Sequence, residues 1–477
     1  MEDTSLDPKD WDAFRSNAHD LLDQALDKMQ GSRDGRVWTP LPQHIKDNLV
    51  SDLPVIGTSH EQISEKMAEL LPYGVGNTHP RFFGWVHGTG NVGGMLAEIA
   101  ATAMNANLGG RDHGAIYVEK QVLAWCRQMM GFPNDAGALI VSGTSMATII
   151  ALKVARDTRL GFETRKTGVG DGKLVGYASA QSHSCISRAF DLLGLGSKAL
   201  RMVPCLDDFT MDLGALRDEI EADKAAGLLP FAVIGTAGSV NVGAIDDLNG
   251  IAKIARDDGL WFHVDGAFGA TGILSDTIRP RLNGMEKAHS LAFDFHKWLH
   301  VNYDAGCVLI RDGDAHLASF AERPEYLTGS TRGLAANSPW PVDFGPELSR
   351  GFRALKIWAH LLEHGTQKLG RAISRNCEQA RYLGEKIAAS KVLELLAPVT
   401  LNIVCFRFSP QGHPDLDTLN GNIVLDLQES GIAAPSTTRL NGQLAIRVNI
   451  TNHRTRFEDI DLLVDEVVRV GGIRRGC

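Results

Sequence analysis

The sequence predicts an α/β protein in which a mostly parallel sheet has helices on both faces and a smaller carboxyl-terminal α+β unit follows. Strand-like and helix-like segments alternate between residues 80 and 360, as in parallel sheets whose strands are joined by helices. A long amphipathic helix comes next, and strand-like segments then return. The chain has 477 residues, more than one hydrophobic core usually supports, so two structural units are expected.

Residues 1–75 are expected to form a helical arm. Apolar residues recur at helical spacing along its first half, and prolines at positions 40, 42 and 54 then interrupt the pattern. An apolar stripe at a chain end needs a surface to cover, either the rest of the chain or a partner subunit. The stripe consists of Trp11, Phe14, Ala18, Leu21, Leu22, Ala25 and Met29.

Residues 76–370 are expected to form the large domain, and residues 371–477 the small one, with strands at 401–408 and 444–450. Helices are expected in the large domain at 146–156 and 249–257. Ligands in such sheets bind beyond the carboxyl ends of the strands, so the residues that follow each strand are the first candidates for a site. The strands expected in the large domain are residues 138–142, 231–235, 261–265, 291–293 and 306–310.

Composition argues against several classes of partner and location. The chain has 48 Lys and Arg against 57 Asp and Glu, a formal net charge of −9, so its mean field does not attract nucleic acid or an anionic membrane. The amino terminus is acidic and has no apolar signal core, and no apolar run approaches the ~20 residues that span a bilayer. Seven scattered cysteines without a C-x-x-C pair predict reduced thiols in a cytoplasmic protein and no metal site.

The first candidate site is the Ser-Gly-Thr-Ser segment at 142–145, between an expected strand and an expected helix. Free backbone N–H groups and the positive end of the helix dipole suit a phosphate there. The alternative is an ordinary helix cap, because Ser and Thr cap helices routinely. The segment also matches the serine motif of subtilisin-like proteases, and His87-Gly-Thr-Gly resembles their histidine motif. The order and spacing of these motifs oppose a protease. That interpretation would also leave the second half of the chain unexplained.

Asp265 ends the apolar strand at 261–265 and is followed by Gly266 and Ala267. A carboxylate at this edge of the sheet can keep the ring nitrogen of pyridoxal 5'-phosphate (PLP) protonated, which makes the ring an electron sink. The small side chain of Ala267 would let a flat ring approach the backbone. The alternative is a strand-end aspartate that starts a turn.

Lys297 lies just beyond the expected strand at 291–293, in the segment Asp-Phe-His-Lys-Trp. A lysine that follows a buried strand and has aromatic neighbours is expected to lose hydration, which lowers its pKa and makes the amine nucleophilic. The alternative is a solvated lysine at the end of a strand.

The phosphate-type turn, the strand-end aspartate and the lysine, in this order and spacing, form the constellation of fold-type I PLP enzymes. The chain resembles the group II PLP decarboxylases, which act on aromatic amino acids, histidine and glutamate. The resemblance covers nearly the whole chain and implies the fold-type I PLP-dependent transferase fold and an active site at a homodimer interface. It rests on the turn, on Val-Asp-Gly-Ala at 264–267, on His-Lys-Trp at 296–298, and on the segments 79–83, 177–184, 236–246 and 446–452.

The resemblance implies a role for each candidate residue. Lys297 would hold PLP as a Schiff base, Asp265 would pair with the ring nitrogen, and His183 would stack on the ring. Without the resemblance, His183 would be interpreted as a core histidine. His79, Trp85 and His87 are candidates for the substrate pocket, with His87 otherwise at the surface. The remaining cofactor-binding candidates are Ser142, Gly143, Thr144, Ser145, Thr236, Ala267 and His296.

The sequence departs from the family pattern in two places. The family carries a tyrosine in a mobile loop that returns a proton to the substrate carbon, but the corresponding segment 334–344 has none. Tyr303 and Tyr326 are the candidates to replace it. The segment 84–90 is glycine-rich and matches neither the aromatic nor the glutamate subtype, so it does not identify the substrate.

The predicted function is PLP-dependent decarboxylation of an L-amino acid to an amine and CO2 by a cytoplasmic homodimer. Other PLP reactions on an amino acid remain open: transamination, oxidative deamination to an aldehyde, or a lyase reaction. A catalytically inactive binding protein of the same fold is a further alternative, which the presence of Lys297 and Asp265 opposes. A subtilisin-like protease is the most remote alternative.

Overall fold

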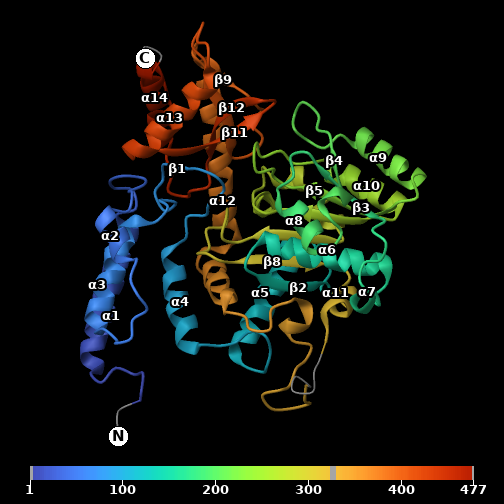
Figure 1. The fold of residues 1–477 in the computed structure, drawn as a ribbon, viewed down its shortest axis with the longest axis horizontal. Helices are drawn as coiled ribbons and strands as arrows, with labels where there is room; N and C mark the ends of the chain where they lie inside the picture. The colour runs from blue at the N-terminus through green and yellow to red at the C-terminus, as the bar shows by residue number, and fades with distance from the viewer. Residues whose placement is uncertain (1–3, 323–328, 475–477) are drawn as a thin grey trace.

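The chain folds into an amino-terminal group of helices, a large α/β domain and a smaller carboxyl-terminal α+β domain (Figure 1). The structure is a computed structural model and describes residues 4–322 and 329–474. The predicted fold class is confirmed.

Seven strands form the central sheet, in the order β2-β8-β7-β6-β5-β3-β4. Strand β8 runs antiparallel to both of its neighbours, β2 and β7, and the other neighbouring pairs are parallel. The carboxyl ends of the other six strands therefore lie at one edge of the sheet, where a ligand site is expected. The strands are β2 (Gly137–Val141), β3 (Leu174–Ser179), β4 (Leu200–Val203), β5 (Leu229–Thr236), β6 (Trp261–Asp265), β7 (Ser290–Asp294) and β8 (Gly306–Ile310).

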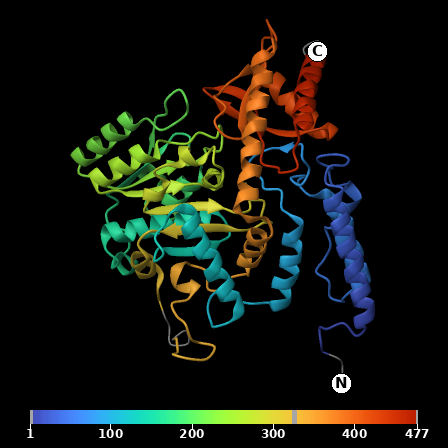
Figure 2. The same ribbon diagram turned by 180° about the vertical axis from the view of Figure 1, so that it is seen from behind.

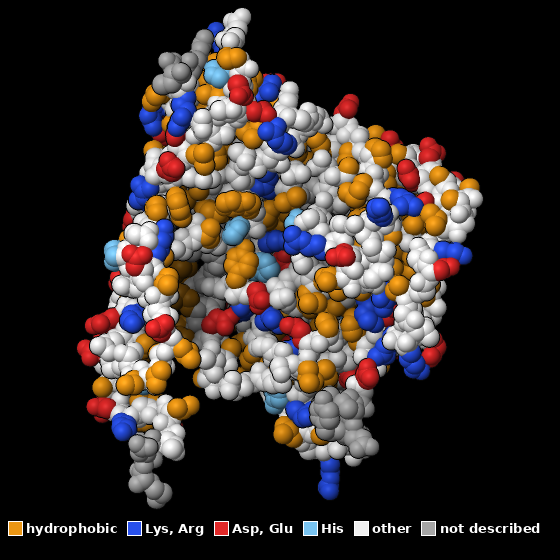
Figure 3. Space-filling view, viewed as in Figure 1, with side chains coloured by type: hydrophobic (Ala, Val, Ile, Leu, Met, Phe, Trp, Pro, Cys, Tyr) orange, Lys and Arg blue, Asp and Glu red, His pale blue; other side chains and the backbone are white. Residues whose placement is uncertain are grey.

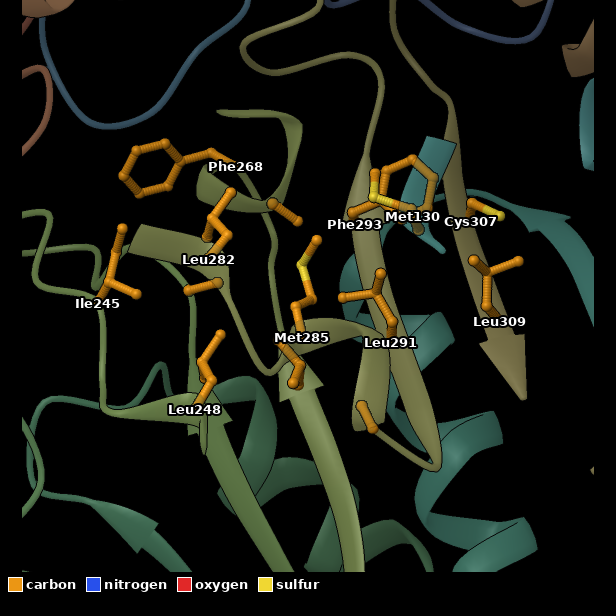
Figure 4. Close-up of a cluster of buried hydrophobic side chains, with 14 of the residues drawn as sticks. Met130, Ile245, Leu248, Phe268, Leu282, Met285, Leu291, Phe293, Cys307 and Leu309 are labelled. Carbon is orange, nitrogen blue, oxygen red and sulfur yellow. The ribbon is translucent and has the colours of Figure 1, made fainter. Parts of the chain in front are cut away.

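Helices cover both faces of this sheet, because alternate residues of each buried strand point into two different cores. Leu291 and Phe293 of β7 contribute to the first core, and Ala292 contributes to the second. Figure 4 shows part of the first core, where Met130 lies beside side chains of β7 and β8. Over the first core lie α5 (Gly114–Met130), α9 (Leu213–Ala225), α10 (Leu248–Asp258) and α12 (Arg353–Ala389), and over the second lie α6 (Thr144–Leu160), α8 (Cys185–Leu192) and α11 (Gly313–Phe320).

The smaller sheet has five strands in the order β1-β11-β12-β10-β9. Strand β1 (Phe82–Phe83) reaches it from the first part of the chain and pairs in parallel with β11. Helix α12 runs from the first core into this domain (Figure 2), so the expected domain boundary at residue 370 falls inside the helix. The backbone of this helix is non-helical at one position, Gly365. The other elements are β9 (Leu393–Leu395), β10 (Ile403–Phe408), α13 (Leu416–Ser430), β11 (Ala434–Leu440), β12 (Gln443–Asn449) and α14 (Phe457–Arg474).

The amino-terminal arm forms α1 (Trp11–Gln30), α2 (Gln43–Asn48) and α3 (His60–Leu70), and α4 (Val92–Met104) follows. Helices α1 and α3 pack together, with the rings of Phe14 and His60 4.9 Å apart. Neither α1 nor α3 has a buried residue, and these helices stand at the edge of the molecule in both views (Figures 1 and 2). The chain itself therefore covers the predicted apolar stripe only in part.

The expected strands of the large domain agree with the observed ones in kind and order. Residues 261–265 and 306–310 have the expected bounds, and the ends of the other three differ by one or two residues. Strands β3 and β4 were not expected, because a glycine interrupts the apolar run of β3 and β4 is a short edge strand that includes Arg201.

Three further findings concern the described part of the chain. No helix there is long and apolar enough to cross a membrane. The six cysteines of the described ranges are free thiols. No group of three or more His, Cys, Asp or Glu side chains among the described residues has an arrangement that could hold a metal ion.

A buried ion pair holds the segment before α12 against the large domain. The guanidinium of Arg350 lies 2.8 Å from the carboxylate of Glu119 in α5 and donates a hydrogen bond to the carbonyl oxygen of Leu108. Glu119 is 1% exposed and Arg350 is 4% exposed. Burial raises the pKa of Glu119, while Arg350 acts in the opposite direction.

Replacing Arg350 with Met should lower the free energy of unfolding by about 3–5 kcal/mol, because Glu119 would stay buried without its counter-charge. The double variant Arg350→Met, Glu119→Gln should recover part of this loss. Denaturant midpoints of the two variants provide the comparison. Equal stability of the single and double variants would show that the loss comes from packing and not from the ion pair.

Candidate active site

The turn between β2 and α6 brings backbone N–H groups to the carboxyl edge of the sheet. Helix α6 begins at Thr144 without a side-chain cap, so the N–H groups of its first turn have no acceptor within the helix. The hydroxyl of Thr144 is buried and has no hydrogen-bond partner among the described residues. Gly306 packs against this turn so closely that a Cβ there would lie 2.6 Å from the Cα of Gly143. The segment 142–145 therefore offers hydrogen-bond donors that suit an anion.

Asp294, the last residue of β7, connects this turn to Lys297. Its Oδ1 accepts a hydrogen bond from the backbone N–H of Thr144 at 2.7 Å, and its Oδ2 lies 2.7 Å from Nζ of Lys297. The same oxygen is 3.7 Å from Nε2 of His296. Asp294 is 1% exposed. It was not among the predicted site residues, although it ends a buried strand just as Asp265 does.

The pKa of Lys297 differs from the prediction. Burial acts to lower it, as expected, but the carboxylates of Asp294 and Asp265 outweigh this effect and the pKa is raised. The predicted lowering is therefore wrong, because the sequence did not reveal that two carboxylates lie beside the amine. In the protein alone, Lys297 is an ammonium ion at neutral pH.

Asp265 ends β6, the strand beside β7. Its Oδ1 accepts a hydrogen bond from the N–H of Ala267 at 3.1 Å, and its Oδ2 lies 4.0 Å from Sγ of Cys185. Burial raises the pKa of Asp265, while Lys297 acts in the opposite direction. Within the described ranges, Asp265 forms no ion pair of its own. A carboxylate that is 3% exposed at this edge is therefore suited to pair with a cationic group.

Thr236 and His183 lie close to Asp265. Thr236 ends β5 opposite Asp265, and its buried hydroxyl has no hydrogen-bond partner in the described part of the chain. His183 follows β3, and its Nδ1 accepts a hydrogen bond from the N–H of Cys185 at 3.2 Å. Partial burial lowers the pKa of His183, and the charge of Asp265 acts in the opposite direction. The partly exposed ring of His183 therefore lies within electrostatic reach of the buried carboxylate.

Aromatic side chains lie near Lys297. The ring of Tyr303 is 4.4 Å from that of His296 and 6.1 Å from that of His87, which is itself 5.9 Å from the ring of Trp85. Burial lowers the pKa of His87 and the charge of Lys297 lowers it further, so His87 and the lysine are close. Figure 3 shows histidines, apolar side chains and charged side chains around a hollow on this face, between α4 and the edge of the sheet.

His79 is not brought to this edge. His79 is buried beside Arg81 and Asp459, and burial lowers its pKa to about 4. One of these neighbours, Asp459, belongs to helix α14 of the small domain. The structure therefore does not support the predicted role of His79 in the substrate pocket. Tyr326 lies outside the described residues.

The match to a family model identifies the class of this protein. The model of the pyridoxal-dependent decarboxylase conserved domain matches residues 42–409. The chain belongs to this family. The protein is therefore a PLP-dependent amino-acid decarboxylase. This class explains the Gly-Thr-Ser segment, so a subtilisin-like protease is not needed to account for it.

Individual relatives agree with this assignment. An aromatic-L-amino-acid decarboxylase of Bacillus atrophaeus is 32% identical over 459 residues, which cover 94% of this chain and 93% of that protein. An L-2,4-diaminobutyrate decarboxylase of Rhizobium meliloti is 31% identical over 422 residues, which cover 87% and 83%. The crystal structure of the glutamate decarboxylase domain of a diaminobutyrate-pyruvate transaminase and L-2,4-diaminobutyrate decarboxylase from Vibrio parahaemolyticus is 27% identical, with a TM-score of 0.85 and coverage of 99% and 98%.

The residues at the edge of the sheet fit the cofactor of this family. The first turn of α6 and the unpartnered hydroxyl of Thr144 suit the phosphate of PLP. The buried carboxylate of Asp265 suits a protonated ring nitrogen, and Lys297 supplies an amine between these two places. Each part of the cofactor thus has a partner of complementary chemistry.

Replacing Asp294 with Asn should lower the pKa of Lys297 in the cofactor-free protein, because it removes the counter-charge that lies 2.7 Å from Nζ. At a fixed pH near 8, the unprotonated fraction should rise roughly tenfold for each unit by which the pKa falls. Peptide mapping after labelling with an amine-specific reagent measures this fraction, with Lys356, which pairs with Glu98, as the internal reference. Unchanged labelling of Lys297 in the variant would contradict the conclusion that Asp294 raises the pKa of this lysine.

Proposed function

We propose that this enzyme removes the α-carboxylate of an L-amino acid as CO2 and releases the corresponding amine, with Lys297 as the residue that forms a Schiff base with PLP. The observation that carries the proposal is the position of Nζ of Lys297, 2.7 Å from Asp294 and close to Asp265, beside a phosphate-type turn. Membership of the decarboxylase family supports the reaction class.

PLP supplies, when bound, a conjugated ring that can accept the electron pair of the bond to the carboxylate. Asp265 would balance the charge of the protonated ring nitrogen, which stabilises the charge that develops as CO2 leaves. Thr144, Ser145 and His296 would hold the phosphate, and His183 would lie against the ring. Residues Ser142, Gly143, Thr236 and Ala267 would complete the cofactor site, the glycine and alanine by leaving room for close approach.

Tyr303 is our candidate for the proton donor to the substrate carbon. Its ring packs 4.4 Å from His296, the neighbour of Lys297 in the chain. Burial raises the pKa of Tyr303, while a backbone hydrogen bond with Gly88 and the charge of Lys297 act in the opposite direction. The hydroxyl therefore holds its proton at neutral pH, as a proton donor must before the transfer. Such a role would explain how the enzyme manages without a tyrosine in the segment 334–344.

An aromatic substrate suits the side chains near Lys297. The ring of His87 lies 5.9 Å from that of Trp85 and 6.1 Å from that of Tyr303, and the side chain of Trp85 is 53% exposed to solvent. Aromatic groups favour such rings as partners in edge-to-face or offset arrangements. The Bacillus atrophaeus relative is named for aromatic L-amino acids, which supports the same class of substrate.

We infer that the functional unit is a cytoplasmic homodimer. Val92, Leu96 and Ile99 on α4 are 41%, 58% and 53% exposed, and α1 and α3 bury no residue. A two-fold contact would cover these apolar side chains, and this is the commonest form of protein oligomer. Light scattering of the PLP-loaded protein should give twice the mass of the 51.7 kDa chain, and a stable active monomer would contradict the inference.

Borohydride reduction tests the proposal directly. The purified protein with PLP should be yellow, and reduction should fix a pyridoxyl group on Lys297, where peptide mapping would find it. A screen of L-amino acids should then show equal release of CO2 and amine, with aromatic substrates preferred. An adduct at another residue would contradict the role of Lys297. A keto acid or an aldehyde as the main product would instead favour transamination or oxidative deamination.

The Tyr303→Phe variant should form amine roughly 100-fold more slowly, the size expected for loss of a positioned proton donor. PLP binding should be retained, because the ring that packs on His296 is kept. Amine, CO2 and aldehyde measured together provide the test. If the proton goes to the cofactor instead of the substrate carbon, hydrolysis releases an aldehyde and leaves the amino group on the cofactor, so CO2 release should fall less than amine formation and the difference should appear as aldehyde. The control is Tyr117→Phe, which removes the hydroxyl of an exposed tyrosine that pairs with Asp112. A normal rate and a normal ratio of the two products in Tyr303→Phe would contradict the role.

A further inference from the structure

A second cluster of titratable side chains lies behind the turn that carries Lys297, outside the site described above. It lines a cavity of about 250 Å³ between the amino-terminal end of α4, the middle of α12 and the loop between β12 and α14. His300, from the segment after β7, completes the lining. None of the roles assigned to the decarboxylation site uses these residues.

Arg454 places positive charge on this cavity without a counter-charge. Its guanidinium forms no ion pair with any described residue, and its Nη1 is buried without a hydrogen-bond partner in the same part of the chain. Burial lowers the pKa of Arg454, which reflects the cost of holding the charge there. An anion in the cavity would offset this cost.

Histidines add further polar groups from three segments of the chain: the turn after β7, helix α12 and the loop between β12 and α14. His300 and His360 are each 3% exposed, and neither ring nitrogen of His300 has a hydrogen-bond partner within the described ranges. The rings of His300 and His453 are 4.9 Å apart, and those of His360 and His364 are 4.8 Å apart. Nζ of Lys368 lies 3.4 Å from Nδ1 of His364. Potential donors therefore converge on the cavity from several sides.

We propose that this cavity binds a small tetrahedral oxyanion, such as sulfate or phosphate. Arg454 and Lys368 supply the charge, and the histidines and the amino-terminal end of α4 supply N–H donors. Among the described residues that line the cavity, Glu363 is the only acidic one, and its carboxylate lies against Gly93, where a Cβ would approach it to 2.3 Å. A metal ion is the weaker alternative, because the described residues include no group arranged to ligate one.

The cavity is connected to the turn that carries the catalytic lysine. The N–H of His300 donates to the carbonyl oxygen of Lys297 at 3.2 Å, and the carbonyl oxygen of His300 accepts a hydrogen bond from Nδ2 of Asn91 at 2.9 Å. An anion held by His300 would therefore stabilise this part of the backbone. Ligand binding to the folded state should raise the unfolding temperature of the enzyme.

The affinity should depend on pH in a definite direction. Burial lowers the pKa of His300 well below its ordinary value and that of His360 to about 3, and the neighbouring histidines lower both further. An anion favours the protonated rings, so binding takes up protons and should strengthen as the pH falls from 6.5 to 5, toward these lowered pKa values. Sulfate is the appropriate probe because its charge is constant in this range. The titratable and charged groups that face the cavity are His300, His360, Glu363, His364, Lys368, His453 and Arg454.

The test is a calorimetric titration of the PLP-saturated enzyme with sulfate, because bound PLP occupies the phosphate-type turn of α6. Lys368→Gln should weaken sulfate binding about three- to tenfold, and Glu363→Gln should strengthen it by a similar factor, since each removes one charge beside the ligand. Both side chains are largely exposed, so the fold should tolerate the changes. The matched control is Arg381→Gln, which removes an exposed cation from the same helix outside the cavity and should leave the affinity unchanged.

Opposite effects of the two variants with no effect of Arg381→Gln, together with tighter binding at pH 5 than at pH 6.5, would support the site. Absence of saturable sulfate binding would overturn the proposal. So would binding that responds to neither variant, or that Arg381→Gln weakens as much as Lys368→Gln does, because the anion would then lie elsewhere or bind through overall charge. These outcomes do not depend on the reaction of the enzyme, so failure here leaves the decarboxylase function intact.

Discussion

The carboxylate of Asp294 is the feature on which the geometry of the active site depends. It receives a hydrogen bond from the first residue of α6 and holds the ammonium group of Lys297, both at 2.7 Å. Hydrogen bonds that involve a charged group and are shielded from water are stronger than neutral ones. One buried side chain therefore fixes the end of β7, the start of α6 and the lysine relative to one another. Gly306 packs closely on Gly143, and the absence of a side chain at Gly306 leaves room for this arrangement.

The charges at this edge also explain how a cofactor of mixed charge would be oriented. Asp265 and Asp294 are buried carboxylates, and Lys297 balances only one of them. A protonated ring nitrogen beside Asp265 would supply the second positive charge. The phosphate would face the other way, toward the N–H groups and the positive dipole end of α6. Because reversing the cofactor would bring like charges together, electrostatics favours a single orientation.

Features that depend on one strand and the residues after it could be predicted from the sequence. Strand β6 is a continuous apolar run that ends in Asp265, and the segment 142–145 follows another such run, so both candidates were found without the fold. The raised pKa of Lys297 could not be predicted, because it depends on how the chain turns back to bring Nζ against Asp294. The contact of Tyr303 with His87 joins segments far apart in the sequence. The pairing of β1 with β11 and the environment of Arg454 likewise arise only in the folded chain.

The measurement that tests this account most directly is the turnover of Asp265→Asn with the best substrate found. The variant should still bind PLP, because the phosphate-type turn and Lys297 are unchanged, but it should lose about 100- to 1000-fold in turnover, the size typical of removing a preorganised electrostatic partner. His183→Ala should lose less, since a stacked ring orients the cofactor without supplying charge. Near-normal turnover of Asp265→Asn would show that another carboxylate, with Asp294 the nearest candidate, balances the ring nitrogen.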